Sequence, residues 1–208
     1  MSQGKLPEAS IERLSTYYRR LSELNQEGVK NIFSGQLGEQ VGVSGDQVRK
    51  DLSYIGSFGS KGSGYAVKLL CKEIANILGL QKERRMALLG VGNLGKALLS
   101  YHGLERWNFE IVAVFDNNSR KVGKLILGKK CQHPLNLEKV VKEKRIDIAI
   151  LAVPAAAAQE AADSIVRAGI KVILNFVPVA LSVPGDVKVE DVDFSVKLKK
   201  LSYFLQNI

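Results

Sequence analysis

The fold of this chain is decided by the stretch Met86-Ala87-Leu88-Leu89-Gly90-Val91-Gly92-Asn93-Leu94-Gly95. Its apolar start predicts a buried strand, and the pattern G-x-G-x-x-G that follows opens a predicted helix. In that context Gly90 permits a tight turn, Gly92 lets the backbone approach a pyrophosphate, and Gly95 allows helix and strand to pack closely. Backbone N–H groups and the positive end of the helix would hold the phosphates. We therefore expect a dinucleotide site that includes Gly90, Val91, Gly92, Asn93, Leu94 and Gly95.

An acidic residue lies where the ribose of a dinucleotide would need one. Asp116 ends the next predicted strand, 21 residues after Gly95. A carboxylate at this place accepts hydrogen bonds from the ribose hydroxyls and repels a 2′-phosphate, which predicts NAD⁺ or NADH and disfavours NADP(H). The alternative is a glycine-rich turn between strand and helix, followed by an unrelated aspartate. However, the strand, the glycines and the aspartate all occur where dinucleotide binding requires them.

Short apolar runs alternate with helical stretches after this motif. We predict strands over residues 86–89, 111–115, 146–153 and 170–176, with helices near 93–102, 134–144 and 155–168. This alternation predicts an α/β Rossmann fold, a doubly wound parallel sheet with right-handed crossovers. Ligands of such sheets bind at the carboxyl ends of the strands. Val153 and Pro154 are therefore expected beside the nicotinamide half, and Asn175 and Phe176 are further candidates.

The N-terminal part of the chain follows a different pattern. Helices are predicted over residues 7–26, from a cap at Ser34 to a stop at Gly42, from a cap at Ser44, and over 66–79. Two short helices joined by a glycine-containing turn form the helix-turn-helix layout, and the glycine-rich residues 56–64 predict a hairpin that would serve as a wing. We expect a winged-helix domain over residues 1–82, a Rossmann domain over 83–192 and a C-terminal helical segment over 193–208.

The helix that Ser44 opens is the candidate DNA-binding element, with Gln47 at capping-box spacing. Val48, Leu52 and Ile55 fall on one face and should pack on the core. The opposite face then presents cations, hydroxyls and an aromatic ring to phosphates and base edges. The expected DNA-binding residues are Ser44, Gln47, Arg49, Lys50, Ser53 and Tyr54, with Lys61 at the tip of the wing. From the pattern alone, a solvated face in a three-helix bundle is the alternative.

Overall composition excludes some classes of protein but does not decide DNA binding. The 208 residues carry a net charge of +9, and most of the excess of basic residues lies in the Rossmann half. The case for DNA binding therefore depends on where individual basic residues lie. Two cysteines indicate a reducing compartment and no disulfide framework. The chain starts without the apolar region of a signal peptide, and no apolar run approaches the ~20 residues of a membrane span. We expect a cytoplasmic protein with no membrane partner.

The sequence offers little that catalysis or metal binding would require. His102 and His133 are the two histidines, no Cys and His cluster indicates a metal site, and no segment remains for a substrate domain. We therefore expect no catalytic residue and no metal. Residues 194–206 predict an amphipathic helix, and its apolar face needs a partner surface. A second copy of the chain is the expected partner, which fits the two-fold symmetry of helix-turn-helix dimers on palindromic DNA.

Several motifs together resemble the Rex family of redox-sensing transcriptional repressors, from about Pro7 to Leu205. The motifs are Val48-Arg49-Lys50-Asp51-Leu52-Ser53-Tyr54, Gly62-x-Gly64-Tyr65, Gly90–Gly95, Asn175-Phe176-x-Pro178, Val192-Asp193-Phe194 and Leu201-Ser202. The run over residues 48–54 is much more specific than the glycine motif. This run makes it a poor explanation that the polar face of the helix opened by Ser44 is only solvated.

The resemblance implies a homodimer that binds a palindromic operator and is released by NADH, with NAD⁺ competing for the same site. Arg49, Lys50 and Ser53 would lie in the major groove, and Lys61 would lie on the minor-groove side. Lys121 matches a family position near the adenosine. One departure is Ser60-Lys61-Gly62, which has a single basic residue where many members have two.

The resemblance also implies a switch and a domain-swapped C-terminal helix that inserts between the two domains of the partner. Tyr101 would lie by the nicotinamide. Asp193 of one subunit would pair with Tyr101 or Arg19 of the other, according to the ligand. Two other functions stay open from the residues alone. A small NAD-dependent oxidoreductase with a helical dimerisation domain is the first, and a CoA-ligase-like nucleotide-binding module, which would not explain residues 48–54, is the second.

Overall fold

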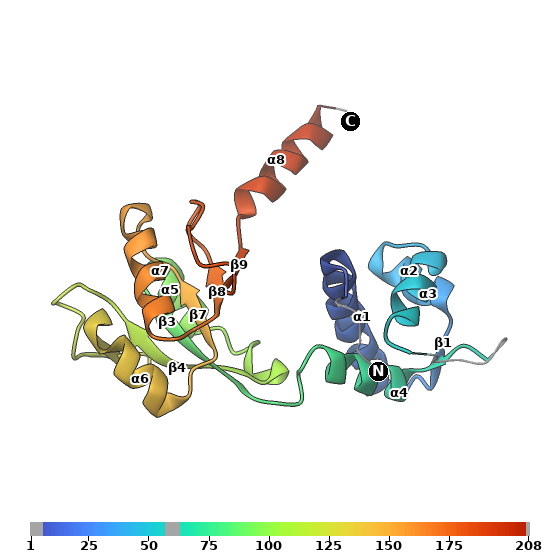
Figure 1. Ribbon diagram of the computed structural model, residues 1–208. Coiled ribbons are helices and arrows are strands. Elements are labelled where there is room, and N and C mark those ends of the chain that lie inside the picture. The colour runs from blue at the N-terminus through green and yellow to red at the C-terminus, as the bar shows by residue number, and fades with distance from the viewer. Residues whose placement is uncertain (1–5, 57–62, 207–208) are drawn as a thin grey trace. The chain divides into compact units, whose positions relative to one another are not determined.

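The computed structural model describes residues 6–56 and 63–206, and the chain divides into two compact units, Met1–Lys82 and Glu83–Ile208 (Figure 1). Each unit has its own hydrophobic core. Lys61 and most of the predicted wing lie outside the described residues.

Helices build most of the first unit: α1 (Glu8–Gln26), α2 (Ser34–Val41), α3 (Gly45–Ser53) and α4 (Val67–Ile77). Their buried apolar faces form a common core, which includes Leu14 and Leu21 of α1, Leu37 of α2, Val48 of α3 and Ile74 of α4. Strand β1 (Asn31–Ile32) pairs antiparallel with β2 (Tyr65–Ala66), so the segment before α2 is paired with the segment before α4. The predicted helix-turn-helix is confirmed, whereas the pairing of β1 with β2 was not predicted from the sequence.

The caps of the two short helices differ from each other. Ser44 caps α3 as predicted, because its Oγ accepts a hydrogen bond of 3.1 Å from the backbone N–H of Gln47. The predicted Ser34 cap of α2 is wrong, since Phe33 occupies the cap position and its N–H donates to Gln36 Oε1 at 3.0 Å. Ser34 is instead the first helical residue, and its Oγ accepts from the guanidinium of Arg49 at 2.6 Å.

A seven-stranded sheet forms the centre of the second unit, in the order β5-β6-β4-β3-β7-β8-β9. Only β5 and β6 pair antiparallel among the neighbours of this sheet in the described residues. The six parallel strands thus follow the order 3-2-1-4-5-6 of dinucleotide-binding folds, which confirms the predicted Rossmann sheet. The strands are β3 (Arg84–Leu89), β4 (Phe109–Phe115), β5 (Leu125–Ile126), β6 (Lys129–Gln132), β7 (Ile148–Leu151), β8 (Val172–Asn175) and β9 (Lys188–Asp191).

Helices cover both faces of this sheet. Alternate residues of β3 serve the two sides: Ala87 and Leu89 pack with α6 (Leu137–Lys144) and α7 (Ala158–Arg167), whereas Met86 and Leu88 pack on the side of α5 (Asn93–Leu99). A central strand buried on both faces has a continuous apolar sequence, which explains the strong strand signal of residues 86–89. The topology brings the carboxyl ends of β3, β4, β7 and β8 to one edge.

Strands β6 and β9 were missed by the sequence pattern for a physical reason. Their sequences, Lys-Lys-Cys-Gln and Lys-Val-Glu-Asp, are short and mostly polar, and β9 has no fully buried residue. Strands at or near the edge of a sheet bury less apolar surface, so their residues carry little periodic signal.

The chain ends with α8 (Phe194–Leu205), which has no buried residue. Its apolar side chains Phe194, Leu198, Leu201 and Leu205 are all more than half exposed. The structure thus leaves the predicted apolar face of this helix without a covering surface in the described chain. Across residues 6–56 and 63–206, we find no helix with the length and apolarity that crossing a membrane requires.

Candidate dinucleotide site and nucleic-acid interface

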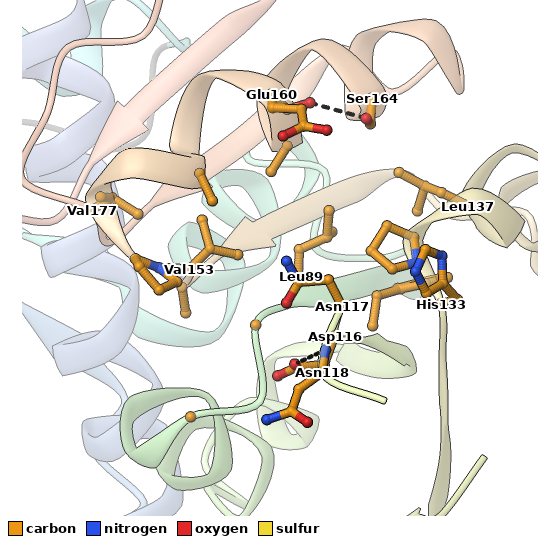
Figure 2. A pocket seen from close by; sticks show the side chains of 18 of the residues that line it. Leu89, Asp116, Asn117, Asn118, His133, Leu137, Val153, Glu160, Ser164 and Val177 are labelled. Carbon is orange, nitrogen blue, oxygen red and sulfur yellow. Dashed lines mark hydrogen bonds between the residues drawn. The ribbon is translucent and has the colours of Figure 1, made fainter. Parts of the chain in front are cut away.

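A cavity of about 800 Å³ lies at the carboxyl ends of the central strands of the sheet. Figure 2 shows Leu89 at the end of β3, Asp116 after β4, Val153 after β7 and His133 after β6 around this space. The volume falls in the range of about 300–1,000 Å³ that is typical of small-molecule sites. The cavity is therefore the place where this fold would bind a dinucleotide.

The glycines of the motif differ in what surrounds them. Gly90 has φ +95°, and a Cβ there would lie 2.3 Å from the carbonyl oxygen of Ala152. A Cβ at Gly95 would lie 2.0 Å from the carbonyl oxygen of Gly90. A Cβ at Gly92 would meet no protein atom within 4 Å, and Gly92 lines the cavity. The fold itself thus requires glycine at 90 and 95, whereas Gly92 keeps the backbone bare toward the cavity.

Asp116 is buried and tied to the glycine loop. Its Oδ2 accepts hydrogen bonds from the backbone N–H of Val91 at 3.0 Å and from Lys121 Nζ at 2.7 Å. Its Oδ1 accepts from the N–H of Asn118 at 2.9 Å, a bond that Figure 2 shows as a dashed line. Burial alone would raise the pKa of Asp116, but hydrogen bonds from Lys121, Asn118 and Val91 outweigh it and lower the pKa. An ionised carboxylate accepts about four hydrogen bonds, so Oδ1 retains room for a hydroxyl donor.

The structure brings most of the expected dinucleotide residues to the cavity wall. Those that line it are Gly90, Gly92, Asn93, Leu94, Asp116, Lys121, Val153, Pro154 and Phe176. The expected residues that are absent from the wall are Val91, Gly95, Tyr101 and Asn175. Val91 is fully buried, and its contribution is the N–H that holds Asp116.

Asn175 supports the loop after β8. Its Nδ2 donates to the carbonyl oxygens of Val177 and Val179 at 3.0 and 3.2 Å and to Asp191 Oδ1 at 2.8 Å. Its Oδ1 accepts from the N–H of Val177 at 3.0 Å. The fully buried amide thus fixes the loop that carries Phe176 to the cavity.

Part of the wall was not predicted from the sequence. His133, Pro134 and Leu135 reach the cavity because they follow β6, the strand that the pattern missed. His133 Nδ1 accepts from the N–H of Leu135 at 3.2 Å, which orients the ring. Ser164 and Arg167 of α7 also line the space. A histidine-proline pair ending a strand at the same sheet edge is the signal that could have found this side of the site.

The exposed face of α3 carries the expected DNA-binding side chains. Arg49 pairs with the exposed Asp46 on the same helix and donates to Ser34 Oγ of α2, which is partly buried. The Lys50 ammonium has no hydrogen-bonding or ionic partner in the described part of the chain. Ser53 Oγ donates to the carbonyl oxygen of Lys50 at 2.7 Å, and Tyr54 is 45% exposed.

The other side of α3 holds a buried carboxylate to which the sequence pattern assigns no role. Val48 and Leu52 are buried as predicted, and between them Asp51 is fully buried. Gln47, expected to face DNA, donates through Nε2 to Asp51 Oδ1 at 3.1 Å and is partly buried. Sequence periodicity showed which face is apolar, but it could not show that a carboxylate is satisfied inside that face.

The three expected switch residues lie on the surface of a helix or next to the end of one. Arg19 is exposed on α1. Tyr101 follows α5 and is 62% exposed, with its ring so close to Gly103 that a Cβ on that glycine would lie 2.3 Å from the Tyr101 Cζ. Asp193 caps α8, because its Oδ1 accepts from the N–H of Ser195 at 2.8 Å. Among residues 6–56 and 63–206, no group of three His, Cys, Asp or Glu side chains could hold a metal ion.

Known proteins resemble both halves of the chain. Residues 81–179 match the family model described as "CoA binding domain", and residues 5–53 match the model described as "Putative DNA-binding protein N-terminus". The redox-sensing transcriptional repressor Rex of Desulforamulus reducens is 47% identical over 99% of this chain and 98% of its own length. The protein of the same name from Thermus thermophilus is 48% identical, over 98% of this chain and 95% of its own.

The chain belongs to the Rex family of redox-sensing transcriptional repressors. A crystal structure of RSP, a Rex-family repressor, matches with a TM-score of 0.90 at 39% identity and covers 98% of this chain and 95% of that chain. RSP in complex with β-NAD⁺ and operator DNA matches with a TM-score of 0.92 at 40% identity, covering 98% of this chain and 94% of that chain.

Membership in the Rex family decides between the functions that the residues left open. The relatives, which align with this chain over nearly their whole length, are named as repressors. This confirms a transcriptional regulator and not an oxidoreductase. The match to the "CoA binding domain" model spans the Rossmann part alone and does not extend to the helix-turn-helix. The resemblance seen in the sequence is thus confirmed, while the role of each site residue stays a prediction.

Proposed function

We propose that this Rex-family chain is a cytoplasmic homodimer that represses transcription by binding palindromic operator DNA and releases the DNA when NADH binds. NAD⁺ and NADH would compete for the same cavity. The observation that carries the proposal is that one chain combines α3, a candidate recognition helix that exposes Arg49 and Lys50, with a dinucleotide cavity in a separate unit. RSP, which is similar over 98% of this chain, has been crystallised with β-NAD⁺ and operator DNA and with β-NADH.

In the cavity, the pyrophosphate would lie over the bare backbone at Gly92 and Asn93, where a ligand can approach without meeting a side chain. Asp116 Oδ1 would accept a hydrogen bond from an adenosine ribose hydroxyl, with Lys121 nearby. Val153, Pro154 and Phe176 would contact the nicotinamide half, since they end neighbouring strands. NADPH should bind more weakly than NADH because Asp116 would repel its 2′-phosphate, and equal affinities would contradict this role.

On DNA, Arg49, Lys50 and Ser53 would enter the major groove, with Ser44, Gln47 and Tyr54 at the margins of the contact and Lys61 at the wing. Arg49 must first exchange Asp46 and Ser34 for DNA. Exposed ion pairs of this kind contribute ~1 kcal/mol or less, whereas a bidentate contact from arginine to guanine discriminates by about 1–3 kcal/mol. The exposed Asp46 is therefore a weak competitor for the Arg49 guanidinium.

The coupling between ligand and DNA would run through the dimer. The uncovered apolar face of α8 would insert into the partner subunit as a domain-swapped helix. Asp193, at its start, would pair with Tyr101 or Arg19 of the partner according to the ligand. NADH can release DNA only if it binds the non-DNA-binding arrangement more tightly than the DNA-binding one.

The proposal is tested by DNA-binding measurements with nicotinamide nucleotides. A palindromic duplex is first isolated with the wild-type chain by in vitro selection from random DNA. Fluorescence anisotropy should then show tight binding alone and with NAD⁺, and release with NADH. Absorbance at the NADH band should stay constant, since the chain is not expected to oxidise NADH. Failure to select any duplex, or equal effects of NAD⁺ and NADH, would contradict the proposal.

A further inference from the structure

Asp51 lies in the middle of α3 and is fully buried, yet it carries a carboxylate. Its Oδ1 accepts hydrogen bonds from Ser10 Oγ at 3.0 Å, from an Arg13 Nη at 2.7 Å and from Gln47 Nε2 at 3.1 Å. Its Oδ2 accepts from Arg13 Nε at 2.6 Å and from Tyr17 Oη at 2.8 Å. With five donors for about four lone-pair sites, the carboxylate has no acceptor site left unused.

The donors come mainly from α1. Ser10, Arg13 and Tyr17 follow one another at i, i+3 and i+7, so they line one face of that helix. Ser10 and Tyr17 are buried, and Arg13 closes the cluster with a further bond of 3.2 Å to Ser10 Oγ. The fork of Arg13 binds both carboxylate oxygens, a geometry that fixes direction as well as distance.

The carboxylate is held in its charged form. Burial by itself would raise the pKa of Asp51, but the bonds from Arg13, Tyr17, Ser10 and Gln47 outweigh burial and lower the pKa to about 2. Burial also raises the pKa of Tyr17, so its hydroxyl stays a donor. At neutral pH the cluster is therefore an intact ion pair with its hydrogen bonds made.

Helix α3 packs mainly on α2, and α1 packs mainly on α4, so the bonds of Asp51 add a direct link between α3 and α1. The bidentate ion pair adds geometric specificity to this link, because both carboxylate oxygens must stay opposite the Arg13 fork. Asp51 is separated by only one or two positions from Arg49, Lys50 and Ser53, so a rotation of α3 about its axis would displace all three side chains.

We propose that Asp51 is a positioning residue that locks the rotation of the recognition helix on α1 and so sets the discrimination between operator and other DNA. The inference rests on the proposed function. Base-edge contacts need correct placement within a groove, whereas phosphate contacts accept a displaced cation. Loss of the lock therefore costs specific binding more than non-specific binding.

The experiment compares variants of the full chain on two DNA duplexes. One duplex is the palindrome selected with the wild type, and the other is a scrambled duplex of equal length and composition. Asp51→Asn removes the charge at constant volume, and Arg13→Lys keeps the charge but loses the fork. Ile74→Val, a buried substitution in α4 of the same core, is the matched control for stability. Anisotropy is measured where circular dichroism shows each variant folded.

We expect Asp51→Asn and Arg13→Lys to lose about tenfold or more in affinity for the palindrome, with affinity for the scrambled duplex kept within about threefold. Ile74→Val should keep the wild-type ratio, and all variants should bind NADH as the wild type does. If Asp51→Asn fails to fold, Arg13→Lys decides alone. Wild-type discrimination in Arg13→Lys, or parallel loss on both duplexes, overturns the proposal. A wild type that binds no palindrome contradicts the proposed function instead.

Discussion

Gly90 and Gly92 belong to one motif, but the structure gives them different reasons to be glycine. At Gly90 a side chain would collide with the backbone of Ala152, and the residue has a positive φ. At Gly92 there is room for a side chain until a ligand arrives. The spacing of the motif predicted both glycines and Asp116. It could not predict that Val91 and Lys121 would bond to that aspartate, because these contacts depend on how loops close in three dimensions.

Alanine at these two glycines should therefore affect different properties. We expect Gly92→Ala to keep the wild-type melting temperature and to weaken NADH binding by about tenfold or more, since a methyl group would lie where the pyrophosphate approaches. Gly90→Ala should destabilise the Rossmann unit by roughly 1–3 kcal/mol because of strain and backbone overlap. Thermal melts and NADH fluorescence titrations measure both effects. Normal NADH affinity in Gly92→Ala would contradict the placement of the ligand.

Arg49 should matter to DNA alone. We expect Arg49→Ala to weaken operator binding by about 1–3 kcal/mol, as for loss of a base-reading arginine, and to leave NADH affinity unchanged because the two sites belong to separate units. Lys139→Ala on α6, which removes the same charge from an exposed position outside the cavity wall, is the control. Equal loss of NADH binding in Arg49→Ala would refute the assignment of functions to the two units.

At the scale of the element, α3 has two faces with different chemistry. Hydrophobic periodicity predicted its buried face, and Ser44 predicted its start. The same periodicity missed β6 and β9, since polar residues on short strands look like loops. It also gave no role to Asp51, because most partners of this buried carboxylate lie on α1, 34 to 41 positions away in the sequence.

The attachment of α3 to α1 should weaken in acid. The pKa of Asp51 falls from 3.8 to about 2 on folding, so this group binds fewer protons in the folded state. Its contribution of about 2 kcal/mol is fully present above pH ~4 and is lost as the pH falls from about 4 to about 2. Denaturant unfolding from pH 6 to pH 2, followed by a probe of the first unit, should show this loss. Asp51→Asn should lack this pH-dependent part of the free energy of unfolding. An identical dependence on pH in the variant and the wild type would contradict the role of the ion pair.

At the scale of the whole molecule, α8 is the feature that one chain does not explain. The sequence predicted an apolar face in need of a partner, and the structure leaves that face exposed. A sequence pattern shows that such a face must be covered, but it cannot show by what, since the covering surface contributes no signal to the helix itself. The swap and the pairing of Asp193 therefore rest on the resemblance to the Rex family.

Negative charges on the apolar face of α8 should dissociate the proposed dimer into monomers. We expect Leu198→Glu with Leu201→Glu to give a monomer in light scattering and to abolish tight binding to the palindrome, because two half-sites need two linked recognition helices. Replacing the exposed Lys199 and Lys200 by Ser in a second variant tests whether the apolar face itself is responsible. A dimeric double glutamate variant would exclude α8 as the interface.

The central claim is that one protein couples its dinucleotide site to its DNA site, and linkage tests this directly. Binding of the selected palindrome is titrated with and without saturating NADH, and binding of NADH is titrated with and without saturating palindrome. NADH should weaken DNA binding by at least about tenfold, which corresponds to about 1.4 kcal/mol of coupling. The palindrome should weaken NADH binding by the same factor, as reciprocity requires. Independent binding of the two ligands, with both factors equal to one, would contradict the account.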